Sequence, residues 1–342
     1  MALQIGYQLS SEEHRPADLI RYARMAEDHG FDYATISDHF HPWIDAQGQS
    51  PFVWSVIGAV AQATRSLPLG TWVTCPTTRI HPAIIAHASA TVAAMMPGRF
   101  FLGVGTGENL NEHILGDAWP ETEIRQARLE EAIAVIRLLW EGGNKSHHGR
   151  YYTVQNARLY TLPEEPPPLL VATGGPRSAE LAGRLGDGLI ATEAAAEMVR
   201  TFEAAGGRGK PRYGSVTVCW ARNEASARKT AHRIWPTSAM ESSLSWELPL
   251  PKHFEDVATL LTEDAVAESI VCGPDPERYV EAIGEYVTAG FDHVSVHQVG
   301  PDQEGFFRFF ARDVMPRVRK LRGAGRAERR ASRANGRRHR AA

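Results

Sequence analysis

Short apolar runs alternate with longer amphipathic stretches along most of the chain. The apolar runs predict strands at residues 3–9, 33–37, 69–74, 100–105, 169–172, 188–191, 215–221 and 293–298. The amphipathic stretches predict helices at residues 16–29, 52–64, 82–96, 121–140 and 303–321, and a further helix begins near Pro176. This alternation indicates a parallel sheet, and eight strands are the number that closes an α/β barrel. We therefore expect a TIM (β/α)8 barrel, with an open doubly wound sheet as the alternative.

Three segments interrupt the alternation. Residues 142–168 carry tyrosines between polar and proline-rich pieces, and residues 237–252 are rich in Ser and Pro, so we interpret both as insertions into one domain, residues 1–321. Residues 322–342 contain Gly, Ala, Ser and Arg without apolar periodicity, and we expect this Arg-rich tail to be disordered.

Composition and charge narrow the class of protein. The hydrophobic fraction of 43% and the charged fraction of 23% are typical of a globular chain. Eight Arg and one Glu give the tail a charge of +7, so the net charge of -3 leaves -10 for residues 1–321, and we expect no specific nucleic-acid partner. Three cysteines are too few for a disulfide framework. Because we find no leader and no apolar run of the ~18 residues that a membrane helix needs, we expect a cytoplasmic protein.

The end of the second predicted strand carries the most informative polar side chains. In barrels of this kind, active-site groups follow the carboxyl ends of the strands. Asp38 and His39 are adjacent there, and Trp43 supplies an N–H donor nearby. Imidazole has an ordinary pKa near ~6.5, so His39 can exchange a proton with a substrate hydroxyl. The alternatives are a turn cap with a structural histidine, or a metal site at His39 and His41, which lacks histidine ligands on strands four to six.

A glycine run, Gly103 to Gly107, ends the fourth predicted strand and precedes Glu108. A dinucleotide fingerprint would instead follow the first strand and open a helix directly. We interpret the glycines as room for a flat ring close to the backbone, with Glu108 and Asn111 directed at that ligand. The alternative is a tight turn with a solvated glutamate.

Gly174 and Gly175 precede Pro176 at the start of a predicted helix. Backbone N–H groups at a helix N-terminus bind anions without needing Lys or Arg, although an ordinary strand–helix turn has the same sequence. Together with the acid–base pair and the glycine run, these residues favour a flat cofactor with a phosphate-bearing arm.

Three motifs, in this order, resemble those of the luciferase-like barrel oxidoreductases, and specifically the branch that uses the deazaflavin coenzyme F420. They are Ser-Asp-His-Phe-x-Pro-Trp at residues 37–43, Gly-Val-Gly-Thr-Gly-Glu-x-Leu-Asn-Glu at 103–112, and Gly-Gly-Pro with Ala-Gly-Arg-x-Gly-Asp-Gly at 174–188. The resemblance covers residues 3–321. It implies a bacterial-luciferase-like TIM barrel, a homodimer, no metal, and hydride transfer between a CH–OH group and F420.

The resemblance also implies roles for individual residues. His39 would be the acid–base group on the substrate hydroxyl, Trp43 would hydrogen-bond the reacting oxygen, and Glu108 would be the second acid–base group. Glu12 and Thr192 would line the substrate side. Coenzyme-binding positions would be Asp38, Val73, Cys75, Thr106, Gly107, Asn111, Gly174, Gly175, Arg177 and Ser178. A cis peptide bond is implied at Trp72–Val73.

Departures from the family pattern bear on the substrate. Family members that oxidise glucose-6-phosphate hold its phosphate with a Thr, two Lys and an Arg. Thr192 is retained here, but the Lys positions fall at Ala195 and Asp256, and the Arg position falls near Ala282. We therefore expect an F420-dependent dehydrogenase or reductase for a neutral secondary alcohol or ketone, since a phosphate dianion needs cationic partners.

Three other functions stay open at this point. One is a sugar-phosphate dehydrogenase whose cations come from elsewhere, for example Lys252 or Arg278. The others are a luciferase-like monooxygenase that uses reduced FMN, and a non-catalytic F420 carrier.

Overall fold

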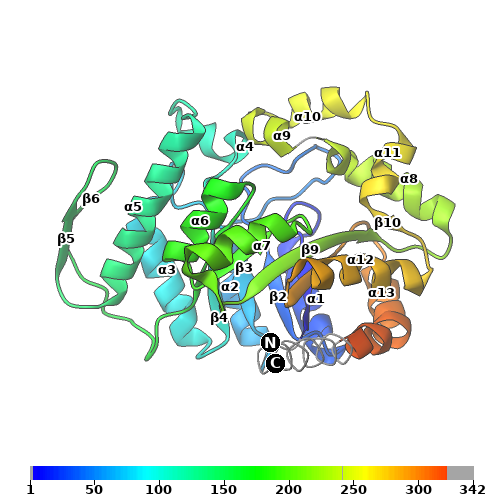
Figure 1. Ribbon diagram of the computed structural model, residues 1–342, viewed down its shortest axis with the longest axis horizontal. Coiled ribbons are helices and arrows are strands. Elements are labelled where there is room, and N and C mark those ends of the chain that lie inside the picture. The colour runs from blue at the N-terminus through cyan, green and yellow to red at the C-terminus, as the bar shows by residue number, and fades with distance from the viewer. Residues whose placement is uncertain (1–2, 241, 322–342) are drawn as a thin grey trace, which may run out of the picture.

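The computed structural model describes residues 3–240 and 242–321, and in it eight parallel strands close into a barrel (Figure 1). They are β1 (Gln4–Leu9), β2 (Tyr33–Ile36), β3 (Leu69–Thr71), β4 (Phe100–Val104), β7 (Leu169–Ala172), β8 (Gly188–Ala191), β9 (Arg212–Cys219) and β11 (His293–Gln298). Each pairs with the next in this order, and β11 pairs with β1. The predicted TIM barrel is confirmed, and the open sheet is wrong. A two-residue strand that the sequence did not indicate, β10 (Val271–Cys272), extends the sheet beside β9.

Helices cover the outside of the barrel. They are α1 (Pro16–Asp28), α2 (Val53–Ala63), α3 (Pro82–Met95), α5 (Thr122–Trp140), α6 (Pro176–Leu185), α7 (Ala196–Phe202), α8 (Glu224–Ile234), α12 (Pro276–Ala289) and α13 (Gln303–Phe309). Proline opens α1, α3, α6 and α12, at the position where a missing N–H and a fixed φ suit a helix. The last helix, predicted as continuous, is interrupted by a π-helical turn, η4 (Phe310–Val314).

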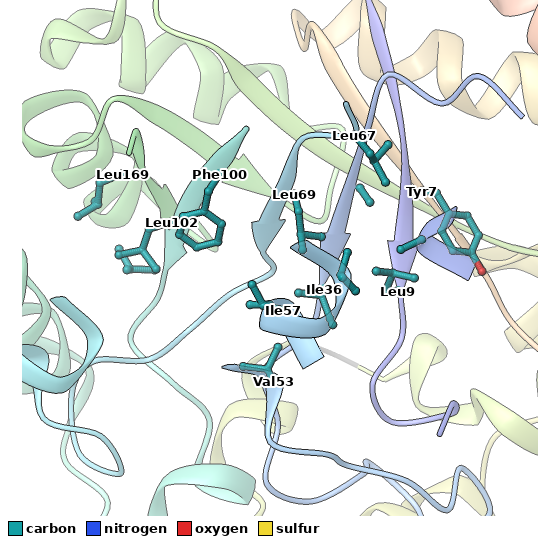
Figure 2. Close-up of a cluster of buried hydrophobic side chains, with 14 of the residues drawn as sticks. Tyr7, Leu9, Ile36, Val53, Ile57, Leu67, Leu69, Phe100, Leu102 and Leu169 are labelled. Carbon is teal, nitrogen blue, oxygen red and sulfur yellow. The ribbon is translucent and has the colours of Figure 1, made fainter. Parts of the chain in front are cut away.

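The main core lies between the strands and these helices. Along β1 and β2, alternate apolar side chains such as Leu9 and Ile36 point outward and pack against Val53 and Ile57 of α2 (Figure 2). Inside the barrel, a second cluster contains the rings of Tyr33 and Phe101. Because both clusters are apolar, polar side chains are found at the ends of the strands instead.

Both predicted insertions form structure of their own. Residues 142–168 contain a hairpin of β5 (Lys145–His148) and β6 (Thr153–Ala157), which projects from the barrel beside α5 (Figure 1). The second insertion contains short helices that the sequence did not indicate, η3 (Pro236–Ala239) and α9 (Ser242–Glu247); α10 (Pro251–Ala258) begins at its predicted end and α11 (Glu263–Ser269) follows. Helix α9 lies beside α4 (Asn109–Glu112), which directly follows β4 and precedes the short turn η1 (His113–Leu115).

Some expectations from the sequence are not tested by the described residues. The Arg-rich tail, residues 322–342, is outside the described residues. Within residues 3–240 and 242–321, no helix is long and apolar enough to cross a membrane. The single-domain boundaries and the homodimer stay predictions.

Candidate active site

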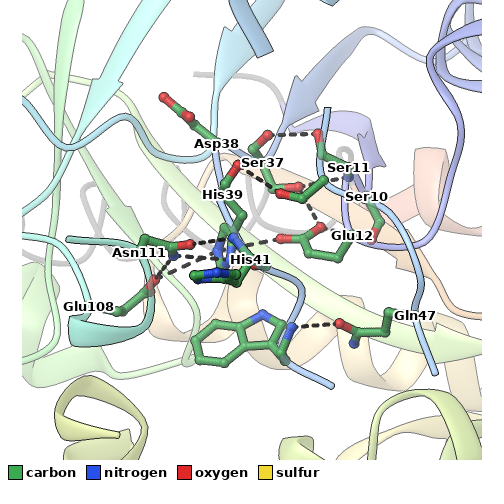
Figure 3. Close-up of polar contacts among 12 residues, drawn as sticks. Ser10, Ser11, Glu12, Ser37, Asp38, His39, His41, Gln47, Glu108 and Asn111 are labelled. Atoms are coloured by element: carbon green, nitrogen blue, oxygen red, sulfur yellow. Dashed lines mark hydrogen bonds and ion pairs between the residues drawn. The ribbon is translucent and has the colours of Figure 1, made fainter. Parts of the chain in front are cut away.

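His39 lies between two carboxylates that come from other strands. Its Nε2 is 3.4 Å from Oε1 of Glu12, which follows β1, and 3.6 Å from Oε2 of Glu108, which follows β4 (Figure 3). Side-chain exposure rises from 3% for Glu12 to 9% for His39 and 28% for Glu108. The three predicted residues are therefore brought together, with Glu108 at the open side.

The other ring nitrogen of His39 has two different partners. Its Nδ1 is 3.1 Å from the amide nitrogen of Asn111 and 3.2 Å from the carbonyl oxygen of His41. The amide oxygen of Asn111 accepts the backbone N–H groups of Phe40 and His41, so its NH2 group faces His39 and Glu108. An N–H donor and a carbonyl acceptor thus lie near Nδ1, and each neutral tautomer of the ring has a partner.

Glu12 is held in place by two hydroxyl groups. Ser37 donates a hydrogen bond of 2.7 Å to its Oε2, and Ser10 donates one of 3.0 Å to the same atom. Since Oε2 is occupied, Oε1 is the oxygen that faces His39.

Trp43 lies beside His39, as the sequence predicted. The two ring centroids are 5.1 Å apart, with 56° between the planes. Trp43 also meets Phe254 of α10 edge to face, with the ring centroids 5.2 Å apart. The backbone N–H of Trp43 donates a hydrogen bond to the side-chain oxygen of Gln47, a residue that the sequence did not indicate.

Asp38 points away from His39 although the two are adjacent in sequence (Figure 3). Its carboxylate accepts a hydrogen bond of 2.7 Å from the hydroxyl of Thr74 and one of 3.0 Å from the guanidinium of Arg79. Arg79 also lies 3.5 Å from a carboxylate oxygen of Glu112. The proposed contact of Asp38 with a coenzyme ring stays a prediction, and Arg79 was not found from the sequence.

This group of Asp38, Arg79 and Glu112 is almost free of solvent, with side-chain exposures of 1%, 6% and 0%. Burial raises the pKa of the Glu112 carboxyl, although the backbone N–H and the guanidinium of Arg79 act in the opposite direction. Burial lowers the pKa of the Arg79 guanidinium, but Asp38 and Glu112 outweigh this and raise it overall. Burial, together with Glu112 and Glu108, raises the pKa of the neighbouring Cys75 thiol well above its ordinary value.

The glycine run after β4 is explained largely by packing within the protein. The Trp72–Val73 peptide bond is cis, as predicted. A Cβ on Gly105 would lie 2.8 Å from Val73, and a Cβ on Gly103 would collide with the backbone of β3. Gly107 has a φ of +89°, which favours glycine. Packing against β3 and Val73 is therefore enough to require glycine at positions 103 and 105, and the approach of a flat ring to this backbone stays a prediction.

The turn before α6 is stabilised by hydrogen bonds to a serine of α6 itself. The N–H groups of Gly174 and Gly175 both donate to the hydroxyl of Ser178, at 3.1 and 3.2 Å. A Cβ on Gly175 would meet no atom within 4 Å, whereas a Cβ on Gly174 would lie 2.8 Å from Trp246 of α9. Arg177 is exposed and pairs with Glu123.

The predicted coenzyme residues form one arc, because β2, β3, β4 and β7 are neighbours in the sheet. Thr106 is half-buried in this arc, and its carbonyl accepts a hydrogen bond from Thr77. Thr192 follows β8 and is exposed, and the described contacts do not join it to Glu12 or His39.

The three positions that depart from the phosphate-binding pattern lie in different surroundings. Ala195 precedes α7 near the strand ends. Asp256 is exposed and forms an ion pair with Lys252, one turn away on α10. Ala282 lies within α12 and packs against the main core. The candidate Arg278 is held by Glu224 and by the carbonyl of Cys272.

Comparison with known proteins assigns the family. The family model described as luciferase-like monooxygenase matches residues 2–293. The chain belongs to the luciferase-like monooxygenase family. The predicted resemblance is thereby confirmed.

Relatives within this family carry more specific names. The chain is 38% identical over 333 residues to the F420-dependent glucose-6-phosphate dehydrogenase of Mycobacterium tuberculosis (strain ATCC 25618 / H37Rv), covering 93% of this chain and 99% of the relative. It is 39% identical over 339 residues to the enzyme of the same name from Kribbella flavida, covering 94% and 100%. The solved structure of an F420-dependent secondary alcohol dehydrogenase in complex with an F420–acetone adduct matches with a TM-score of 0.86 and 32% identity, covering 93% of this chain and 99% of the other.

Proposed function

We propose that this luciferase-like protein is an F420-dependent oxidoreductase that acts on CH–OH groups. The observation that carries the proposal is the imidazole of His39, held between the carboxylates of Glu12 and Glu108 and beside the indole of Trp43. The two relatives and the F420-dependent secondary alcohol dehydrogenase reported above are all named for F420, which supports the proposal.

The arc of residues along β3, β4 and β7 fits a ring compound with an anionic arm. Val73 is half-buried at the end of β3, beside the turn at Thr106 and Gly107, and these residues would hold the ring. The space at Gly175 is open, and it lies at the N-terminus of a ten-residue helix, where an anionic arm is favoured. When bound, F420 supplies a carbon centre that accepts or gives up a hydride.

His39 is proposed to move the proton of the substrate hydroxyl. In the tautomer whose Nδ1–H faces the carbonyl of His41, Nε2 is free to accept that proton during alcohol oxidation. The imidazolium that forms has Glu12 and Glu108 at 3.4 and 3.6 Å, and both carboxylates stabilise its charge. Glu108 is the more exposed carboxylate and exchanges the proton with solvent, and ketone reduction uses the same groups in reverse. The indole N–H of Trp43 is proposed to donate to the reacting oxygen.

We propose a neutral secondary alcohol or ketone as the substrate. The described neighbours of Glu12, His39 and Glu108 are hydroxyls, an amide, a carbonyl and an indole, and no described ion pair joins a Lys or Arg to them. A phosphate dianion near two carboxylates is unfavourable without such a cation.

A sugar phosphate is the second candidate substrate. The identity of 38–39% to glucose-6-phosphate dehydrogenases favours it, as does the retained Thr192. The ion pair with Lys252 also removes the repulsion expected from an unpaired Asp256.

Binding and turnover separate these proposals. The protein is titrated with F420 and with FMN by fluorescence, and then mixed with F420 and either secondary alcohols or glucose-6-phosphate while the absorbance of oxidised F420 is followed. We expect F420 binding and turnover with alcohols. Binding of FMN but not F420 would refute the coenzyme assignment, and efficient turnover of glucose-6-phosphate would refute the substrate assignment alone.

A further inference from the structure

Helix α10, which begins at the end of the second insertion, packs against the loop that carries Trp43. Phe254 of α10 is fully buried and lies in a small apolar cluster with Ile44 and Leu110, against which Trp43 packs. The rings of Phe254 and Trp43 meet at 78°, with centroids 5.2 Å apart, a favourable edge-to-face geometry. The indole therefore contacts both Phe254 of α10 and the imidazole of His39.

The same loop has two further links to the region around the insertion. The buried side chain of Gln47 accepts the backbone N–H of Trp43 and donates to the carbonyl of Ile234, the last residue of α8. Glu255, next to Phe254, accepts the backbone N–H of Asp45. The backbone of the loop is therefore fixed by hydrogen bonds, which leaves the indole of Trp43 to be oriented by packing.

We propose that Phe254 is a positioning residue for the proposed reaction, because its ring holds the indole of Trp43 in place beside His39. This inference rests on the proposed function in one respect, namely that Trp43 donates to the reacting oxygen. A displacement of ~1 Å in a positioned group can lower a rate by ~100-fold, so a ring that limits the freedom of the indole affects turnover without touching substrate. Helix α10, together with the barrel, thus sets the orientation of the indole that is proposed to donate to the reacting oxygen.

A double-mutant cycle tests whether Phe254 acts through Trp43. The variants are Phe254→Leu, Trp43→Phe and the two combined, assayed for kcat and KM with F420 and the best alcohol substrate. We expect Phe254→Leu to lower kcat by about 10-fold when Trp43 is present and by less than about 2-fold in the Trp43→Phe background, since only coupled residues deviate from additivity. Affinity for F420 should be unchanged. The same fold-loss in both backgrounds would overturn the proposal.

Phe306 on α13 offers a matched control, since it is also fully buried. Phe306→Leu should lower the free energy of unfolding as Phe254→Leu does, but any effect on kcat should be the same with and without Trp43. If Phe254→Leu does not fold, Phe254→Met keeps a similar volume with a flexible side chain and serves the same test.

Tryptophan emission gives a readout that does not depend on turnover. The difference spectrum between the parent and its Trp43→Phe variant isolates the emission of Trp43. We expect this difference spectrum to shift to longer wavelength in the Phe254→Leu background, because a less constrained indole meets more water. An identical difference spectrum in both backgrounds would refute the positioning role even if the proposed reaction were wrong.

Discussion

The buried guanidinium of Arg79 serves two carboxylates, and its removal should be costly. In an Arg79→Met variant, Asp38 and Glu112 keep side-chain exposures of about 1% and 0% but lose their shared counter-charge. Removing one partner of a buried ion pair costs about 3–5 kcal/mol. Glu112 retains the N–H groups of residues 78 and 79, at 3.2 and 2.8 Å, which limits the loss. We therefore expect the free energy of unfolding to fall by about 3–5 kcal/mol.

The pH dependence of this loss has a definite sign. Burial already raises the pKa of Glu112 in the folded protein, and the guanidinium that opposes this is absent in the variant. A carboxyl whose folded-state pKa is above its unfolded value, about 4.3, makes the folded state take up protons, so stability increases as pH falls. The deficit of Arg79→Met relative to the parent should therefore shrink between neutral pH and about pH 5.

Urea unfolding of parent and variant at several pH values measures both quantities. Arg21→Met is the matched control, because Arg21 is half-exposed in its pairs with Asp18 and Glu304 and should cost less than about 1 kcal/mol. If Arg79→Met loses no more free energy of unfolding than Arg21→Met, or if its loss grows as pH falls, the reasoning is refuted.

Three further changes test other parts of the structure. His39→Ala should remove most turnover and leave F420 affinity largely intact; a collapse of coenzyme binding in the fluorescence titration would instead give His39 a structural or coenzyme-binding role. Burial raises the pKa of the Glu13 carboxyl, but the hydrogen bond from His297 and other contacts outweigh burial, so that this pKa is lowered overall. The ionised carboxylate therefore stabilises the fold, and this contribution is lost as pH falls below about 4.5. Glu13→Gln should therefore lose stability at neutral pH in urea unfolding, and a deficit that does not shrink in acid would contradict this. Gly105→Ala should cost about 1–3 kcal/mol because its Cβ would lie 2.8 Å from a side chain, whereas Gly58→Ala, in open space within α2, should be neutral or stabilising.

The barrel could be predicted because each of its strands is a short apolar run between turn signals. The pattern of apolar and polar residues within a short segment is enough to locate each strand, and the observed strand bounds differ from the predicted ones by few residues. Helices α9, α10 and α11 have only six to eight residues each, so their periodicity is too short to recognise. Strand β10 has two residues and exists only because β9 extends beyond the barrel to pair with it.

The site could be predicted where chemistry follows directly from a strand end. His39 and Glu108 were found in this way, since parallel strands end at the same edge of the barrel, whereas Glu12 was assigned through the family resemblance. Arg79 and Phe254 have no local signal, because each acts on a residue far away in the chain. The packing requirement for glycine at position 105 could not be seen for the same reason: Val73, the side chain that its Cβ would meet, follows another strand, β3.

The hydrogen-bonded group around His39 is built entirely from the first half of the barrel. Ser10, Glu12, Ser37, Glu108 and Asn111 all precede residue 115, whereas the turn before α6 and the segment after β8 belong to the second half. The fold thus places the proposed proton-exchanging residues in the first half, and the second half contacts them through α9 and α10. Under the proposed function, changes after residue 170 would alter the surroundings of the substrate while the residues proposed to exchange protons stay the same, so one acid–base group would serve different substrates.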